Sequence, residues 1–224
     1  MTFSISARCE KTGMLGIAIS SSSPAVAARC AHARAGVGVV ATQNITDPSL
    51  GPKGLDLLAS GLSAEAALVR LLEGYETAPW RQVVILDAEG RAAIHSGEHT
   101  LGVNATAKGA NCAAAGNLLA NAAVPAAIVA AFERAEGHLG DRLLAAMQAG
   151  LAAGGEAGPV HSAGLYLVRD VTWPVADLRV DWAESNPLDA LGTLWNLYKP
   201  QLEDYVTRAI DPTAAPSYGV PGDL

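Results

Sequence analysis

The first nine residues alternate between apolar and polar side chains. One face of the chain is apolar (Phe3, Ile5, Ala7 and Cys9) and the other is polar (Thr2, Ser4, Ser6 and Arg8). Side chains of an extended chain point alternately to its two faces, so this period of two predicts a half-buried β-strand. A strand at this position ties the start of the chain into a sheet.

Further strands are predicted where short apolar runs lie between turn residues. Residues 11–13 form a predicted turn, so the first strand and residues 14–20 make a β-hairpin. The same reasoning predicts a second hairpin across residues 88–90. The remaining expected strands cover residues 36–43, 82–87, 91–96, 109–115, 162–169 and 178–182.

Helices are predicted where capping residues precede runs with an apolar period of three to four residues. Ser63 is a predicted N-cap, and Glu65 falls in the first turn, where the helix dipole favours a negative charge. Pro125 and Pro187 fit first-turn positions, and Pro200 is expected to bend or divide the last helix. The expected helices cover residues 54–60, 64–73, 124–136, 139–152 and 186 onward, whereas 25–33 is either a short helix or a loop.

The order of these elements predicts the fold class. Pairs of helices separate groups of strands without a regular β-α-β alternation, which favours an α+β protein of antiparallel sheets with helices outside them. The chain has 224 residues, of which 50% are hydrophobic, enough for one sizeable core. We expect a single domain over residues 1–210 and an irregular tail, rich in Pro, Ala and Gly, over 211–224.

Composition restricts the partners. The net charge is −7 and Lys and Arg do not cluster, so neither nucleic acid nor an anionic membrane surface is an expected partner. No apolar run approaches the roughly 18 residues of a membrane span, and no signal peptide pattern opens the chain. We therefore expect a cytoplasmic protein. Cys9, Cys30 and Cys112 lack the spacing of a zinc site or a disulfide framework.

Two motifs that suggest bound groups are rejected from their context. Residues 36–41 match the glycine pattern of dinucleotide-binding proteins, but they lie inside a predicted strand and no helix follows directly. His95 and His99 have the spacing of helical metal ligands, but their segment is a predicted strand and loop without a carboxylate partner. We expect neither a cofactor nor a metal.

Thr2 is the candidate nucleophile. A small residue at position 2 permits removal of the initiator Met, which would leave Thr2 at the start of the chain. Its hydroxyl would then lie beside a free α-amine with a pKa near ~8, which can act as the general base. The alternative is that Thr2 only begins a strand.

Compact uncharged polar groups occur at several predicted strand ends. They are Ser20 to Ser23, Thr42-Gln43-Asn44, Gly116-Asn117 and His161-Ser162. Such groups suit recognition of a polar amide, or an oxyanion hole built from Asn117 and backbone N–H groups. For any one of these clusters ordinary turn chemistry is the better explanation, and only the four clusters together with a candidate terminal nucleophile favour a site. If the first and third strands are neighbours, Thr42, Gln43 and Asn44 would lie near Thr2.

The order of several motifs resembles a bacterial family. They are Met1-Thr-Phe-Ser-Ile-Ser-Ala-Arg8, Ala35-Gly-Val-Gly-Val-Val-Ala-Thr-Gln43, Gly51-Pro-x-Gly-Leu-Asp-Leu-Leu58, Gly61-Leu-Ser-Ala-Glu-x-Ala-Leu68, Arg81-Gln-Val-x-x-x-Asp87, Gly116-Asn-x-Leu119 and Ala153-Gly-Gly155 followed by Ser162-Ala163. The resemblance covers roughly residues 1–200. The family is domain-of-unknown-function family number ten twenty-eight, in the N-terminal nucleophile (Ntn) hydrolase superfamily.

The resemblance implies a fold and a reaction. The fold would be a four-layer αββα sandwich, two antiparallel sheets between helix layers. Thr2 would attack the carbonyl of a small-molecule amide, and water would hydrolyse the acyl-enzyme. Asn117 and Ser162 would contact the oxyanion or the amine. The candidate substrate-binding residues are Arg8, Ser21, Ser22, Thr42, Gln43, Asn44 and His161.

Two other functions stay open on the same fold. One is a non-catalytic protein that binds a small molecule through the polar strand ends. The other is an assembly protein, which would expose apolar stripes over residues 126–132 and 188–197. A homo-oligomer, in the simplest case a dimer, is expected under each of these functions.

Overall fold

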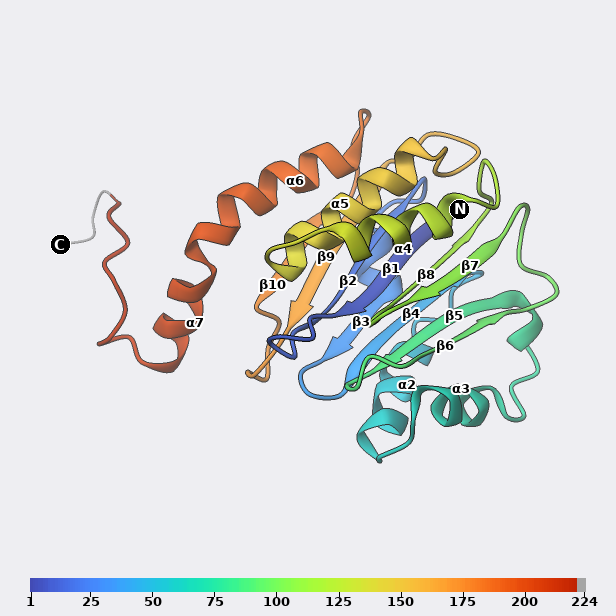
Figure 1. Cartoon of the computed structure of the whole chain (residues 1–224), viewed down its shortest axis with the longest axis horizontal. Helices are drawn as coiled ribbons and strands as arrows, with labels where there is room; N and C mark the ends of the chain where they lie inside the picture. The colour runs from blue at the N-terminus through green and yellow to red at the C-terminus, as the bar shows by residue number, and fades with distance from the viewer. Residues whose placement is uncertain (221–224) are drawn as a thin grey trace.

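The computed structural model describes residues 1–220 and contains two antiparallel β-sheets (Figure 1). The six-stranded sheet has, in spatial order, β10 (Ala176–Val180), β9 (Ser162–Val168), β2 (Leu15–Ser21), β1 (Thr2–Arg8), β8 (Cys112–Asn117) and β7 (Ala105–Gly109). The four-stranded sheet has β3 (Ala31–Arg34), β4 (Gly38–Asn44), β5 (Arg81–Asp87) and β6 (Ala92–Ser96).

Helices cover the outer faces of the two sheets (Figure 1). Seven α-helices lie within the described residues: α1 (Val26–Cys30), α2 (Leu50–Ala59), α3 (Ala64–Leu72), α4 (Val124–Arg134), α5 (Leu139–Ala152), α6 (Pro187–Tyr198) and α7 (Leu202–Ile210). Short 3₁₀ turns cover Ala78–Trp80 and Lys199–Gln201, and the second of these contains Pro200 and separates α6 from α7 as predicted.

Strand β1 lies near the middle of the six-stranded sheet, between β2 and β8. Its apolar face, which includes Phe3 and Ile5, packs against the helices α4 and α5. The prediction of a half-buried strand was wrong, because Ser4 and Ser6 on the polar face are also buried. The second sheet covers that face, and Ser4 contacts it directly.

Three apolar layers hold the sandwich together. Between the sheets, Leu15 and Ile17 of one sheet pack with Val84 and Leu86 of the other. Outside the larger sheet, α4 and α5 supply Ile128, Phe132, Leu143 and Met147, and outside the smaller sheet α2 and α3 supply Leu55, Leu58, Leu68 and Leu71. The predicted α+β fold, a four-layer αββα sandwich, is confirmed.

Most predicted elements occur, with three differences. The strand β3 was not predicted. The expected strand over 109–115 is the end of β7, a turn and most of β8, and Asn111 adopts the left-handed φ of 60° in that turn. Helix α2 begins at Leu50 and not at residue 54, because Pro52 is tolerated in a first turn.

The apolar stripe over 126–132, which an assembly protein would expose, faces inward. Ile128, Val129 and Phe132 are buried against the sheet. On α6, Leu188 and Trp195 are buried, whereas the other side of the helix leaves apolar side chains exposed.

Over residues 1–220, no helix combines the length and apolar character that crossing a bilayer requires. The described residues also bring no three His, Cys, Asp or Glu side chains together as metal ligands. Cys9, Cys30 and Cys112 are free and buried. Residues 211–220 contain turns but neither helix nor strand, and residues 221–224 of the predicted tail lie outside the described residues.

Candidate active site

Four short polar side chains stand side by side on four adjacent strands. Ser162 of β9 lies opposite Ser21 of β2, and Thr2 of β1 lies opposite Asn117 of β8. Phe3 pairs with Ser20, so Thr2 and Ser21 are next in register, and their hydroxyl oxygens are 3.4 Å apart. All four side chains are buried. We call Ser162, Ser21, Thr2 and Asn117 the polar row.

Met1 covers this row. Its carbonyl oxygen accepts hydrogen bonds from the hydroxyls of Thr2 and Ser21. Ser21 is held in place by the N–H of Ser23, which donates to its Oγ at 3.0 Å. A carbonyl group therefore lies beside the Thr2 hydroxyl, with a second hydroxyl directed at the carbonyl oxygen. With Met1 in place, Thr2 is 6% exposed.

Ser162 faces away from Thr2 toward helix α1. Its hydroxyl donates to the carbonyl oxygen of Ser23 at 2.6 Å and accepts from the N–H of Val26 at 3.3 Å. Its hydrogen-bonding capacity is used in fixing the loop between β2 and α1. The polar row thus contains Ser162 by register, but its hydroxyl supports Ser21 and its loop and does not contact Thr2.

Side-chain amides of the second sheet hold Asn117 in one orientation. Gln82 Nε2 donates to the carbonyl oxygen of Gly116 at 3.1 Å, which accepts only, so Gln82 Oε1 must face the other way. That oxygen accepts from Asn117 Nδ2 at 3.2 Å and from Gln43 Nε2 at 2.7 Å. Ser4 extends the chain of bonds by donating to Gln43 Oε1 at 2.9 Å.

This orientation decides what Asn117 can offer. Its Oδ1 is buried and has no hydrogen-bond partner among the described residues, whereas its Nδ2 already donates to Gln82. The free atom is an acceptor, which suits an amine and not an oxyanion. Of the two contacts predicted for Asn117, the geometry favours the contact with the amine.

Glu156 is a component of this region that the sequence analysis missed. It is 4% exposed and lies in the loop before β9, where both carboxylate oxygens accept from the N–H of Ser22, at 3.1 and 3.2 Å. Burial raises the pKa of Glu156 to about 7, against opposing effects from the chain's amino group, Ser22 and His161. The signal in the sequence is a single acid within the glycine-rich stretch 154–158 that precedes a predicted strand.

The other predicted residues divide into two groups. His161 lies beside the row, because its backbone N–H donates to the carbonyl oxygen of Ser21 at 2.8 Å. Its ring stacks on that of Trp182, with 4.3 Å between the ring centroids. The side chains of Thr42 and Asn44 bind the backbone of nearby loops. The Thr42 hydroxyl donates to the carbonyl oxygen of Asp47. The Asn44 amide donates to the carbonyl oxygens of Trp80 and His99 and accepts from the N–H of Leu101. The strands β1 and β4 are not neighbours in one sheet; they face each other from the two sheets.

The structure does not bring Arg8 to Thr2. Arg8 is at the other end of β1, six residues away, which corresponds to about 20 Å of strand. It contacts Asn111 and lines a cavity of about 220 Å³ with Glu10, Glu133 and Arg142.

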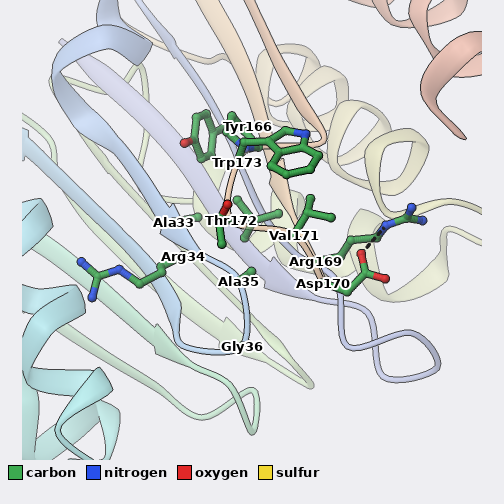
Figure 2. Close-up of a pocket in the computed structure, with 12 residues that line it drawn as sticks. Ala33, Arg34, Ala35, Gly36, Tyr166, Arg169, Asp170, Val171, Thr172 and Trp173 are labelled. Carbon is green, nitrogen blue, oxygen red and sulfur yellow. Dashed lines mark ion pairs between the residues drawn. The ribbon is translucent and has the colours of Figure 1, made fainter. Parts of the chain in front are cut away.

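A larger cavity, of about 660 Å³, also lies at the Arg8 end (Figure 2). Leu15 pairs with both Arg8 and Val168, which fixes this placement. The walls come from the end of β3 and its turn, and from the segment Tyr166 to Pro174, which includes Trp173 and the ion-paired Arg169 and Asp170 (Figure 2). Neither cavity is lined by a member of the polar row.

The comparisons agree with the class that this geometry defines, an α+β protein with an αββα sandwich. The chain belongs to the family of unknown function DUF1028, whose family model matches residues 2–191. The structure of protein SPO2555 from Silicibacter pomeroyi, from the same family, is similar with a TM-score of 0.84 and 27% identity, over 91% of this chain and 89% of that chain.

Two further solved structures are similar at a low level. One is Anbu, the ancestral beta-subunit, from Yersinia bercovieri, with a TM-score of 0.39 and 11% identity, over 92% of this chain and 97% of that chain. The other is the Gly-1 mutant of Anbu from Hyphomicrobium sp. strain MC1, with a TM-score of 0.43 and 12% identity, over 98% of this chain and 100% of that chain. These scores carry no argument about function. No curated protein matches the chain.

Proposed function

We propose that the protein is an Ntn-type amidohydrolase that cleaves the C–N bond of a small amide, with Thr2 as the nucleophile after removal of Met1. The observation that carries this proposal is the carbonyl of Met1, whose oxygen accepts from both Thr2 and Ser21. A substrate carbonyl in that place would lie within reach of the nucleophile and of a second donor.

The proposed reaction has two steps. The Thr2 Oγ attacks the substrate carbonyl carbon while the α-amine of Thr2 takes the hydroxyl proton and passes it to the leaving nitrogen, so the C–N bond breaks and an ester forms on Thr2. Water then adds to the ester, and its proton returns to Thr2 Oγ as the acid is released. In this mechanism the Ser21 hydroxyl donates to the developing oxyanion, and Asn117 Oδ1 accepts from the α-amine.

We test this proposal with two variants of Thr2. Intact-mass measurement of untagged protein should first show loss of Met1. Thr2→Ala should then lower hydrolysis across a panel of small amides by at least about 10³-fold, because the nucleophile is gone. Thr2→Ser, which keeps a hydroxyl, is the matched control and should retain measurable turnover. Complete retention of Met1, or full activity in Thr2→Ala, would overturn the proposal.

We further propose that the protein is cytoplasmic and that it forms a homo-oligomer. We propose one domain over residues 1–210 and a homodimer formed through α6 and α7, where Leu194 and Leu197 are 38% and 65% exposed. If Met1 is retained, the function that remains is non-catalytic binding or assembly on the same fold.

A further inference from the structure

We propose that the substrates of this site are α-aminoacyl amides, and that Glu156 binds the free ammonium group next to the bond that is cut. The inference rests on the proposed function of Thr2 and names its substrate class. Met1 is the guide, because it is an α-aminoacyl group attached to Thr2.

The contacts of Met1 define three parts of a subsite. Its ammonium group lies close enough to the Glu156 carboxylate to lower the pKa of that carboxyl, although the two groups form no ion pair. Its carbonyl oxygen accepts from the hydroxyls of Thr2 and Ser21. The end of its side chain lies against the loop at Gly158, where a Cβ would be 3.6 Å from Met1 Cε. The carbonyl oxygen and the side chain of Met1 are thus held by contacts, and Glu156 is the carboxylate whose charge acts on its ammonium group.

An acyl group on the Thr2 hydroxyl would occupy the same space. The Oγ and the backbone nitrogen of Thr2 are attached to adjacent carbons of one residue. The Met1 carbonyl oxygen already accepts a hydrogen bond from that Oγ. Once Met1 is removed, its volume is vacated, and the acyl part of an ester on Oγ lies where Met1 had been. An α-aminoacyl group would then place its ammonium group at Glu156.

The surroundings of Glu156 favour a cation. The carboxylate is buried, and within residues 1–220 its hydrogen-bond donor is a single neutral group, the N–H of Ser22. A buried carboxylate without a positive partner is unfavourable, so removal of Met1 leaves a place for another cation. The other side chain that acts on it is His161, whose Nδ1 already forms a hydrogen bond with the carbonyl oxygen of Ala183 at 2.8 Å.

The α-amine of Thr2 does not compete for Glu156. Thr2 lies opposite Asn117 in the sheet, and Asn117 Oδ1 is a buried acceptor that no residue of the described chain satisfies. The two acceptors therefore serve two amines: Asn117 the amine of the enzyme, and Glu156 the amine of the substrate.

The test compares two substrates that differ only at the amine. They are the 7-amino-4-methylcoumarin amides of L-methionine and of N-acetyl-L-methionine, assayed with the full processed chain. A charge-assisted hydrogen bond to a buried carboxylate predicts a kcat/KM about 10- to 100-fold higher for the free amine. Glu156→Gln keeps the shape and the acceptor for Ser22, and should reduce this ratio to near one.

Glu133→Gln is the matched control. Glu133 also accepts from a backbone N–H, that of Ala110 at 2.9 Å, but at the opposite end of the sandwich. Its substitution should leave the substrate ratio unchanged. The discrimination by the unsubstituted protein tests the inference even if Glu156→Gln fails to fold.

Binding of L-methioninol, which has the amine and side chain but no bond to cut, separates the two proposals. Hydrolysis of both amides at equal kcat/KM would overturn this inference and leave the amidohydrolase standing. Binding of L-methioninol that depends on Glu156, without hydrolysis of either amide, would show recognition of the amine but overturn the inference that these amides are substrates. Absence of both hydrolysis and L-methioninol binding would overturn the inference entirely, whereas the wider panel of amides with Thr2→Ala decides the hydrolase.

Discussion

At the scale of single residues, the site depends on which atom of each side chain is free. The position of Asn117 alone does not show whether its amide can donate or accept. The Gly116 carbonyl fixes the orientation of the Gln82 amide, and Gln82 in turn fixes the orientation of the Asn117 amide. Ser162 belongs to the polar row and yet its hydroxyl is used by the loop at Ser23. The atoms that remain free to form hydrogen bonds, more than the closeness of a residue to Thr2, therefore determine the role proposed for each residue.

The raised pKa of Glu156 makes the stability of the protein depend on pH. The pKa is about 7 in the folded chain against an ordinary value of 4.5, so between these values the folded state holds more protons than the unfolded state. Glu156 therefore contributes stability that is fully present below pH 4.5 and is lost as the pH rises through 7. The full contribution amounts to about 3 to 4 kcal/mol at about 1.4 kcal/mol per pKa unit, and most of it is lost between pH 4.5 and pH 8.

Urea denaturation at pH 4.5 and pH 8 measures this contribution. The unfolding free energy of the unsubstituted protein minus that of Glu156→Gln should fall by about 2 to 3 kcal/mol between the two pH values. Taking this difference removes the contributions of other titrating groups. A difference that stays constant, or rises with pH, would contradict the assignment.

The sequence identifies part of this site and misses the rest for physical reasons. Thr2, Ser21, Asn117 and Ser162 were all predicted, since uncharged polar residues at strand ends are visible in a sequence. Arg8 was included among the substrate-binding candidates although six residues of the same strand separate it from Thr2, a distance that the predicted strand already implies. Glu156 was missed because its burial depends on a loop packing against the end of β8.

At the scale of elements, the sequence predicts a helix correctly where the spacing of apolar residues and a capping residue indicate the same start. Ser63 accepts from the N–H of Ala66, as expected of an N-cap, and α3 follows from it. Strands made of small residues lack such a signal. Residues 109–115 were predicted as one strand, although they contain the last residue of β7, a turn and most of β8, because the small residues on both sides of Asn111 do not mark the turn.

The packing of α5 against α6 predicts opposite effects for two glycine substitutions. A Cβ at Gly140 would lie 2.5 Å from Cζ2 of Trp195, a buried ring that also donates to Asp141. Gly140→Ala should lower the unfolding free energy by about 1 to 3 kcal/mol, since a rigid ring must move.

Gly192 supplies the matched control on α6. No atom lies within 4 Å of a Cβ built there, so Gly192→Ala should raise stability by about 0.5 to 1 kcal/mol through helix propensity alone. Chemical denaturation of both variants checks the pair. Equal effects of the two substitutions would show that Trp195 does not fix the distance between the helices.

At the scale of the whole molecule, the sandwich leaves α6 and α7 at one side, extending beyond the sheets (Figure 1). Their exposed apolar residues are Leu194, Leu197 and Ile210. Several exposed apolar side chains along one helical arm favour contact with a second copy of the chain.

Light scattering tests the proposed dimer. Leu197→Glu should shift the mass from dimer toward monomer, because it places a charge in the interface. Val69→Glu, at a residue of α3 that is 69% exposed on the opposite helix layer, should leave the mass unchanged. A monomer for the unsubstituted protein would contradict the proposal.

The polar row has a consequence for the order of events during synthesis. Its members come from positions 2, 21, 117 and 162, so the ribosome must release three-quarters of the chain before the row is complete. Until β8 has been made and has paired, β1 has an unpaired edge, and Met1 before it is open to an aminopeptidase. In the folded chain Met1 is half-buried and Thr2 behind it is 6% exposed. The interval for removing Met1 therefore closes with folding, and the rate of translation bears on how much of the protein acquires a free Thr2.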